Sequence, residues 1–86
     1  MHRNILEARQ RALIAHLLVQ VGALEGRWPA PRLDELRAAL RTADLALAVH
    51  GEPEEAALIL GEAAWPPALQ EPLAALRAEL LGEGES

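Results

Sequence analysis

Apolar residues recur along this chain at the three-to-four-residue spacing of an amphipathic α-helix. The first such segment is predicted to run from Ile5 to Leu24, because Asn4 and Glu7 fit a capping box and Gly26 suits a helix stop. It is apolar around most of its circumference and therefore needs neighbours on several sides. The side chains concerned are Leu13, Ile14, Ala15, Leu17, Leu18, Val19, Val21 and Leu24.

A second helix is predicted after the stiff Trp28-Pro29 connector, with Pro31 in its first turn and Gly51 just after its end. Its polar side carries Arg37, Arg41 and Asp44. Its apolar stripe alternates spacings of three and four, which indicates one buried face. The stripe comprises Leu33, Leu36, Leu40, Ala43 and Leu47, and Leu45 and Val49 widen it.

Two shorter helices are predicted in the second half. One runs from about Pro53 to Ala64, and a turn from Pro67 to Gln70 then leads to the last helix, from Pro72 to Leu81. This division is expected because Pro72 would break a helix that began at Pro67. The last helix follows the stripe Leu69, Leu73, Leu76 and Leu80. Residues 1–82 are thus predicted to form a single helical domain, and residues 83–86 a flexible acidic tail.

Four amphipathic helices with short connectors predict an all-α fold, a small four-helix bundle of antiparallel helical hairpins. The dipeptide Trp-Pro occurs at Trp28 and again at Trp65, 37 residues later. That distance is near the length of helix-hairpin repeats, so a tetratricopeptide-like pair of hairpins is one form of the prediction. Chance recurrence in a chain rich in alanine and leucine is the alternative.

Composition limits how this fold is stabilised. The chain has 86 residues, of which 51% are hydrophobic and 2% aromatic, and it has no cysteine. A core of this size is close to the limit of independent stability, and neither disulfides nor thiolate metal sites can add to it. Close packing or a partner must therefore supply the rest.

The net charge of −5 argues against nucleic acid as a ligand, because phosphate backbones require clustered positive charge. The second helix also lacks the basic character of a recognition helix. One local exception is the cluster Arg3, Arg9 and Arg11. It is read either as a solvated helix face or as a docking patch for an anionic partner.

Catalytic groups are scarce. The nucleophilic hydroxyls are Thr42 and the terminal Ser86, and His16 has Gln20 instead of a metal ligand one turn later. His50 lies beside acidic residues across a turn, at a spacing that matches no established metal site. We therefore expect no enzymatic activity, no metal site and no cofactor.

The apolar run from Ala12 to Leu24 is the one stretch that resembles a signal peptide or anchor. It is too short to cross a bilayer and has no clear cleavage site. A cytoplasmic protein without membrane contact is expected.

Apolar surface is the remaining functional chemistry. A chain of this size buries only about 60 to 65% of its unfolded surface, and the first helix is apolar on most sides. We predict that it meets another protein or a second copy of itself, with a plain bundle that hides every leucine as the alternative. The predicted partner-binding residues are Leu13, Ile14, Leu17, Leu18, Val21, Leu36, Leu40 and Leu47.

Two segments resemble the chaperones of bacterial type III secretion. The helix–connector–helix unit from Arg9 to Val49, with a Gly-x-x-Pro-like connector at Gly26 to Pro31, resembles their small helical-hairpin members. The segment Glu55-Ala56-Ala57, followed by Trp65-Pro66-Pro67-Ala68-Leu69 and Leu73, resembles the end of their tetratricopeptide-like partners.

This resemblance implies a non-enzymatic chaperone or adaptor that holds the needle subunit as a monomer by clasping its amphipathic C-terminal helix. A self-associating, homodimeric structural or regulatory protein is the alternative function.

Overall fold

Residues 2–82 form four α-helices, which confirms the all-α class. The computed structural model describes residues 2–82, with side chains from Ile5 onward, so the predicted acidic tail lies outside the described residues. The helices are α1 (His2–Gly22), α2 (Ala30–Ala48), α3 (Pro53–Gly61) and α4 (Gln70–Leu81). A single 3₁₀ turn, η1 (Pro67–Leu69), precedes α4.

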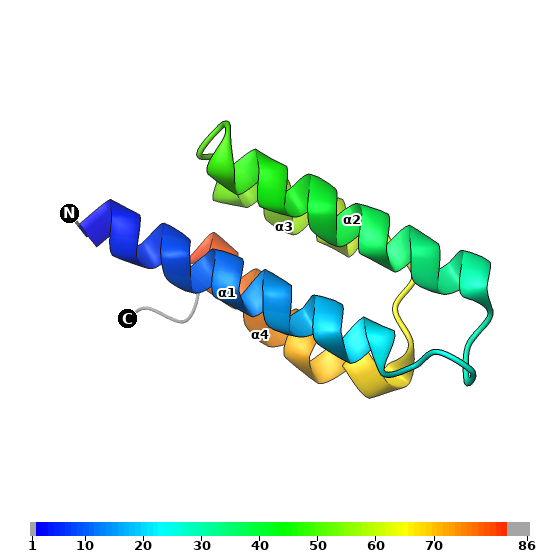
Figure 1. Cartoon of the computed structure of the whole chain (residues 1–86). Helices are drawn as coiled ribbons and strands as arrows, with labels where there is room; N and C mark the ends of the chain where they lie inside the picture. The colour runs from blue at the N-terminus through cyan, green and yellow to red at the C-terminus, as the bar shows by residue number, and fades with distance from the viewer. Residues whose placement is uncertain (1, 83–86) are drawn as a thin grey trace.

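The helices run antiparallel and pack as a four-helix bundle, with α1 and α2 in one layer and α4 and α3 behind them (Figure 1). Each helix packs against its neighbour in sequence, and α1 also packs against α4. The side-chain amide of Gln10 donates to the carbonyl of Glu79 at 3.4 Å across this last contact. A closed bundle results, and both Trp-Pro connectors lie at the same end of it (Figure 1).

One continuous hydrophobic core lies between the four helices. Each helix contributes the residues of a single stripe, as the three-to-four-residue spacing predicts. The buried side chains are Ile14, Leu17, Val21, Leu33, Leu36, Leu40, Ala43, Ala46, Leu47, Ala56, Ala57, Leu60, Trp65, Leu69, Leu73, Leu76 and Leu80.

The predicted boundaries of the first helix were wrong at both ends. It begins at His2, so the Asn4–Glu7 pair does not mark its start, and it ends at Gly22 instead of Leu24. The carbonyl of Leu24 accepts the N–H groups of Arg27 and Trp28 at 2.9 and 3.1 Å, so Leu24 belongs to the connecting turn. Gly26 takes the left-handed conformation that the turn requires, with φ of 87°.

The third helix ends at Gly61, three residues before the predicted Ala64. The indole N–H of Trp65 donates to the carbonyl of Leu60 at 2.7 Å. In a longer helix that carbonyl would accept the backbone N–H of Ala64 instead. The buried indole therefore replaces the next helical hydrogen bond and turns the chain towards α4.

The fourth helix begins at Gln70, two residues earlier than predicted. Pro72 is its third residue, where the backbone N–H has no partner within the helix in any case. Proline thus costs little at this position. The separate turn from Pro67 was predicted correctly and is the 3₁₀ element η1.

Trp65→Phe tests the role of the indole hydrogen bond. The phenyl ring keeps most of the apolar contact but removes the 2.7 Å hydrogen bond to the carbonyl of Leu60, which keeps only the longer contact with the N–H of Ala63 at 3.4 Å. We therefore expect the free energy of unfolding to fall by about 1 kcal/mol. Trp28→Phe is the matched control, because the Trp28 indole is half-buried and makes no hydrogen bond within the described residues. Urea denaturation measures both, and equal losses in the two variants would contradict this role.

Candidate interaction surface

The structure places six of the eight predicted partner-binding residues in the core of the same chain. None of the six is more than 2% exposed: Ile14, Leu17, Val21, Leu36, Leu40 and Leu47. Leu13 and Leu18 are half-buried and pack against that core. In this conformation a partner cannot reach the six core residues, because the facing helices cover them.

Several large apolar side chains remain outside the core instead. Leu45 and Val49, which the sequence pattern assigned to the buried stripe of α2, are 56% and 65% exposed. They lie on the far side of that helix from Leu40 and Leu47, so this part of the prediction was wrong. On α1, Ile5 and Val19 are each 70% exposed. Leu6, Leu58 and Leu81 are the other exposed large apolar residues in the described part of the chain.

A groove of about 520 Å³ runs between the outer faces of α1 and α2, and we call it the α1–α2 groove. Alanines of α1 form one side of it at spacings of four and three, and the side chain of Leu45 forms the other. Ile14, which belongs to the core, lies at its base. Its full lining is Ala8, Arg11, Ala12, Ile14, Ala15, Leu18, Arg41, Asp44 and Leu45.

A bidentate ion pair joins the two walls of the groove. Arg11 donates from Nε and from one terminal nitrogen to the two carboxylate oxygens of Asp44, at 2.9 and 3.1 Å. These hydrogen bonds raise the pKa of Arg11 above its usual value. The pair fixes α1 relative to α2 and neutralises the carboxylate of Asp44. Within residues 5–82, Arg41 makes no salt bridge, so its positive charge remains unpaired in the groove.

The arginine cluster at the start of the chain is mostly engaged within the molecule. Arg9 pairs with the carboxylate of Glu79 on α4 at 2.6 Å, and Arg11 pairs with Asp44 on α2. The side chain of Arg3 lies outside the described ones. Two of the three arginines therefore form ion pairs with neighbouring helices, which argues against an anion-docking patch.

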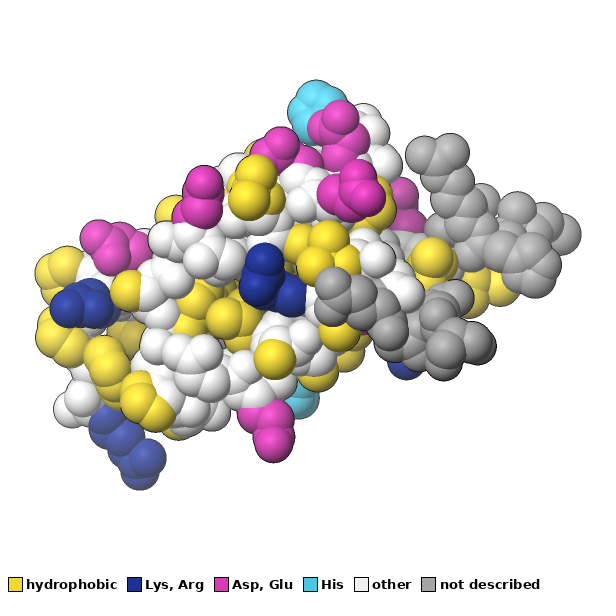
Figure 2. Space-filling model, turned by 180° about the vertical axis from the view of Figure 1, so that it is seen from behind, with side chains coloured by type: hydrophobic (Ala, Val, Ile, Leu, Met, Phe, Trp, Pro, Cys, Tyr) yellow, Lys and Arg dark blue, Asp and Glu magenta, His cyan; other side chains and the backbone are white. Residues whose placement is uncertain are grey.

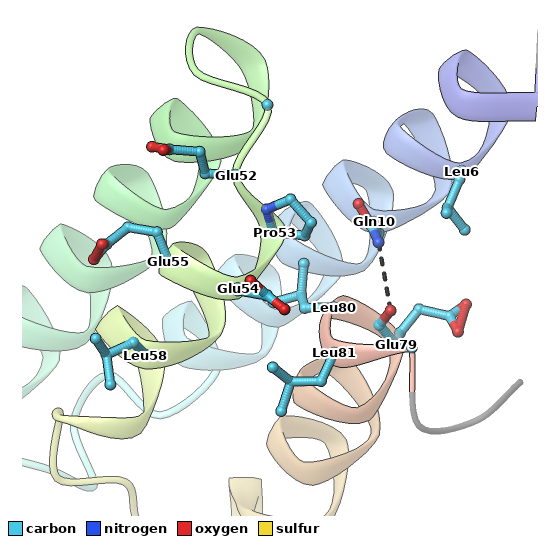
Figure 3. Close-up of a pocket in the computed structure, with 12 residues that line it drawn as sticks. Leu6, Gln10, Glu52, Pro53, Glu54, Glu55, Leu58, Glu79, Leu80 and Leu81 are labelled. Atoms are coloured by element: carbon cyan, nitrogen blue, oxygen red, sulfur yellow. Dashed lines mark hydrogen bonds between the residues drawn. The ribbon is translucent and has the colours of Figure 1, made fainter.

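A second groove, of about 650 Å³, opens between α1, α3 and the end of α4 (Figure 3). Leu6, Leu58 and Leu81 give it apolar side chains, and glutamates of the α2–α3 connection and of α3 surround it. Gly82, the last described residue, is part of its lining. The lining of the α1–α2 groove, by contrast, includes neither end of the described range.

The face formed by α3 and α4 has a different character. Its apolar side chains form separate patches, with acidic side chains along one edge (Figure 2). Among the described residues, no group of three or more His, Asp or Glu is placed to hold a metal ion. Nor is any helix in that range long and apolar enough to cross a membrane.

No protein-family model matches this chain, and neither does any curated protein or solved structure. The surface therefore has to be interpreted from its own geometry.

Sequence reasoning missed the alanines of α1 and the exposed side of α2. Ala8, Ala12 and Ala15 repeat at helical spacing, but alanine is common on both buried and exposed faces. The usable signal was the pair Leu45 and Val49, four residues apart on the side of α2 that also carries Arg41. Neighbouring exposed apolar residues indicate an interaction surface only when they belong to a contiguous patch, and the structure is needed to show that Leu45 lies beside the alanines of α1.

Two charge substitutions on α2 test this assignment of faces. Leu45→Glu places a carboxylate in solvent and should leave the free energy of unfolding within about 0.5 kcal/mol of wild type. Leu47→Glu, two residues later, buries an unpaired charge where the leucine is 1% exposed, and should abolish cooperative folding. Circular dichroism during thermal unfolding distinguishes the two, and similar behaviour of both variants would show that α2 is rotated from the position described.

Proposed function

We propose that this protein is a non-catalytic interaction module that binds an amphipathic helix of another protein in the α1–α2 groove, in the manner of a small helical chaperone or adaptor. The observation that carries the proposal is an apolar groove that lies outside a core already complete. Ile14 closes its base and Leu45 stands at its edge. Burying these groups stabilises a complex without requiring the bundle to open.

The shape of the groove suits a helix. Two parallel or antiparallel helices present a shallow channel between them, and a third helix can lie along it with its apolar face inward. Alanine on the α1 side leaves space in the channel for larger side chains of the bound helix. The Arg11–Asp44 pair bridges the two walls of the channel, and the core packing of α1 on α2 forms this channel before a helix binds.

The resemblance to type III secretion chaperones supports the same type of function, because those proteins hold a client by its amphipathic helix. On this proposal the chain works in the cytoplasm, where it covers an aggregation-prone helix of a client protein until the client is needed. The residues that carry this work are those of the α1–α2 groove, and the buried leucine stripes shape it from below.

Self-association is the second candidate. Ile5 and Val19 lie on the outer face of α1 beside the groove and are as exposed as any large apolar residue described. A second copy could cover them. A stable homodimer buries about 800 Å² on each partner, a considerable part of the 5569 Å² accessible surface of this chain. Light scattering on the purified protein tests this directly, since a tight dimer would favour the second candidate.

Leu45→Glu tests the proposed function. Affinity capture from a lysate of the source cells, quantified by mass spectrometry, should recover a helical partner with the wild-type chain and about tenfold less of it with Leu45→Glu. The loss is expected because a desolvated leucine at the groove edge is replaced by a charge.

Leu58→Glu is the matched control, because Leu58 is 55% exposed and Leu45 is 56% exposed, but Leu58 lies on α3. Recovery of the same partner should be unchanged in this variant. If Leu58→Glu alone loses the partner, binding occurs at the second groove and the proposal is wrong.

A further inference from the structure

The α1–α2 groove has a defined pattern of size and charge. Three alanines at spacings of four and three line its α1 side: Ala8, Ala12 and Ala15. Arg41 brings a positive charge to its α2 side. On the basis of the proposed function, we propose that the groove selects a foreign helix with large aliphatic side chains over the three alanines and a carboxylate facing Arg41.

The small side chains of the three alanines leave space for large side chains of the bound helix. A methyl group fills little of a channel of about 520 Å³, so the occupant must supply the volume if the interface is to reach the packing density of a protein interior. The spacing of Ala8, Ala12 and Ala15 is also that of one helical face. A helix with leucine, isoleucine or methionine at positions i, i+3 or i+4, and i+7 matches this row.

A second copy of this chain does not match the row. The seven exposed large apolar residues in the described range are Ile5, Leu6, Val19, Leu45, Val49, Leu58 and Leu81. Among these, only Leu45 and Val49, the residue that caps the end of α2, lie three or four residues apart, and Leu45 already forms one wall of the groove. If α1 of a second copy lay in the groove, its outer row would be Ile5, Ala8, Ala12, Ala15 and Val19, which has large side chains only at its two ends. Alanine would then oppose alanine along the middle of the groove and leave its volume unfilled, so a foreign helix with large side chains at these positions matches the groove better.

The charges of the groove favour an acidic flank on that helix. The bidentate contact with Arg11 satisfies Asp44, so this carboxylate offers little attraction to a cation. Arg41 makes no salt bridge within residues 5–82, so the groove has a local positive charge although the chain as a whole has a net charge of −5. An opposite charge at the edge of an interface steers the partner and fixes its orientation. A glutamate or aspartate beside the apolar row of the bound helix would pair with Arg41.

Two synthetic helices test the inference, each roughly five turns long with one leucine row at the spacing given above. One carries glutamate along the flank of this row, and the other carries lysine at the same positions. Their dissociation constants for wild-type protein, Arg41→Glu and Arg32→Glu are measured by isothermal titration calorimetry. Arg32 is the matched control, because it is exposed on the same helix outside the groove lining and undergoes the same change of charge.

We expect the glutamate peptide to bind wild type about threefold to fivefold more tightly than the lysine peptide, the size typical of an exposed charge pair. Arg41→Glu should abolish or reverse this preference, and Arg32→Glu should preserve it. About 0.5 M salt should weaken the preference, because it screens exposed charges.

The outcomes separate this inference from the proposed function. If the two peptides bind wild type equally and neither binds Leu45→Glu, the groove binds helices but does not select them by charge. This result would overturn the inference and leave the proposed function in place. If neither peptide binds and light scattering shows a dimer that Leu45→Glu dissociates, the second copy is the occupant and both proposals fail. If neither peptide binds a monomeric protein, both fail as well.

Discussion

A single hydrophobic core shared by four helices is the constraint on which the rest of this structure depends. With 86 residues the chain can form one layer of contacts between helices, and each helix can turn only one stripe of side chains towards it. The first helix has more apolar residues than one stripe can hold. Once Ile14, Leu17 and Val21 have entered the core, the remaining apolar side chains of α1 lie at the surface or at its edge.

Helical periodicity predicted the class of the fold and most of the core, because the stripes of all four helices recur at unambiguous spacing. It did not predict the two ends of α1, the end of α3 or the start of α4. The end of α3 depends on the indole of Trp65, which reaches back to the carbonyl of Leu60, and that bond exists only after the chain has folded back. The start of α4 depends on Pro72 falling within the first turn, where proline is harmless. The end of α3 is thus a property of tertiary position, whereas the start of α4 follows the local rule that the first N–H groups of a helix have no partner within it.

The candidate site was harder to predict from sequence than the fold, for a related reason. The residues with the strongest apolar pattern, such as Leu17 and Leu40, are those that a core recruits first. A partner can bind only the side chains that stay exposed once the core has formed. In the α1–α2 groove these are a row of alanines beside Leu45 and Arg41. Their individual signals are weak. They form a surface only when the antiparallel packing of α1 on α2, held by Arg11 and Asp44, brings them together.

Ile14, Leu17 and Val21 are buried in the core and out of reach of partners, whereas Leu45, Val19 and Val49 are exposed. This division is the central claim. Relaxation of methyl NMR signals by a soluble gadolinium chelate measures this directly in the free protein, because the effect falls steeply with distance from solvent. The account predicts strong relaxation for the methyl groups of Leu45, Val19 and Val49, and weak relaxation for those of the first three residues. Strong relaxation of the Ile14 and Leu17 methyl groups would contradict it, and would show that α1 separates from the bundle to present the opposite face.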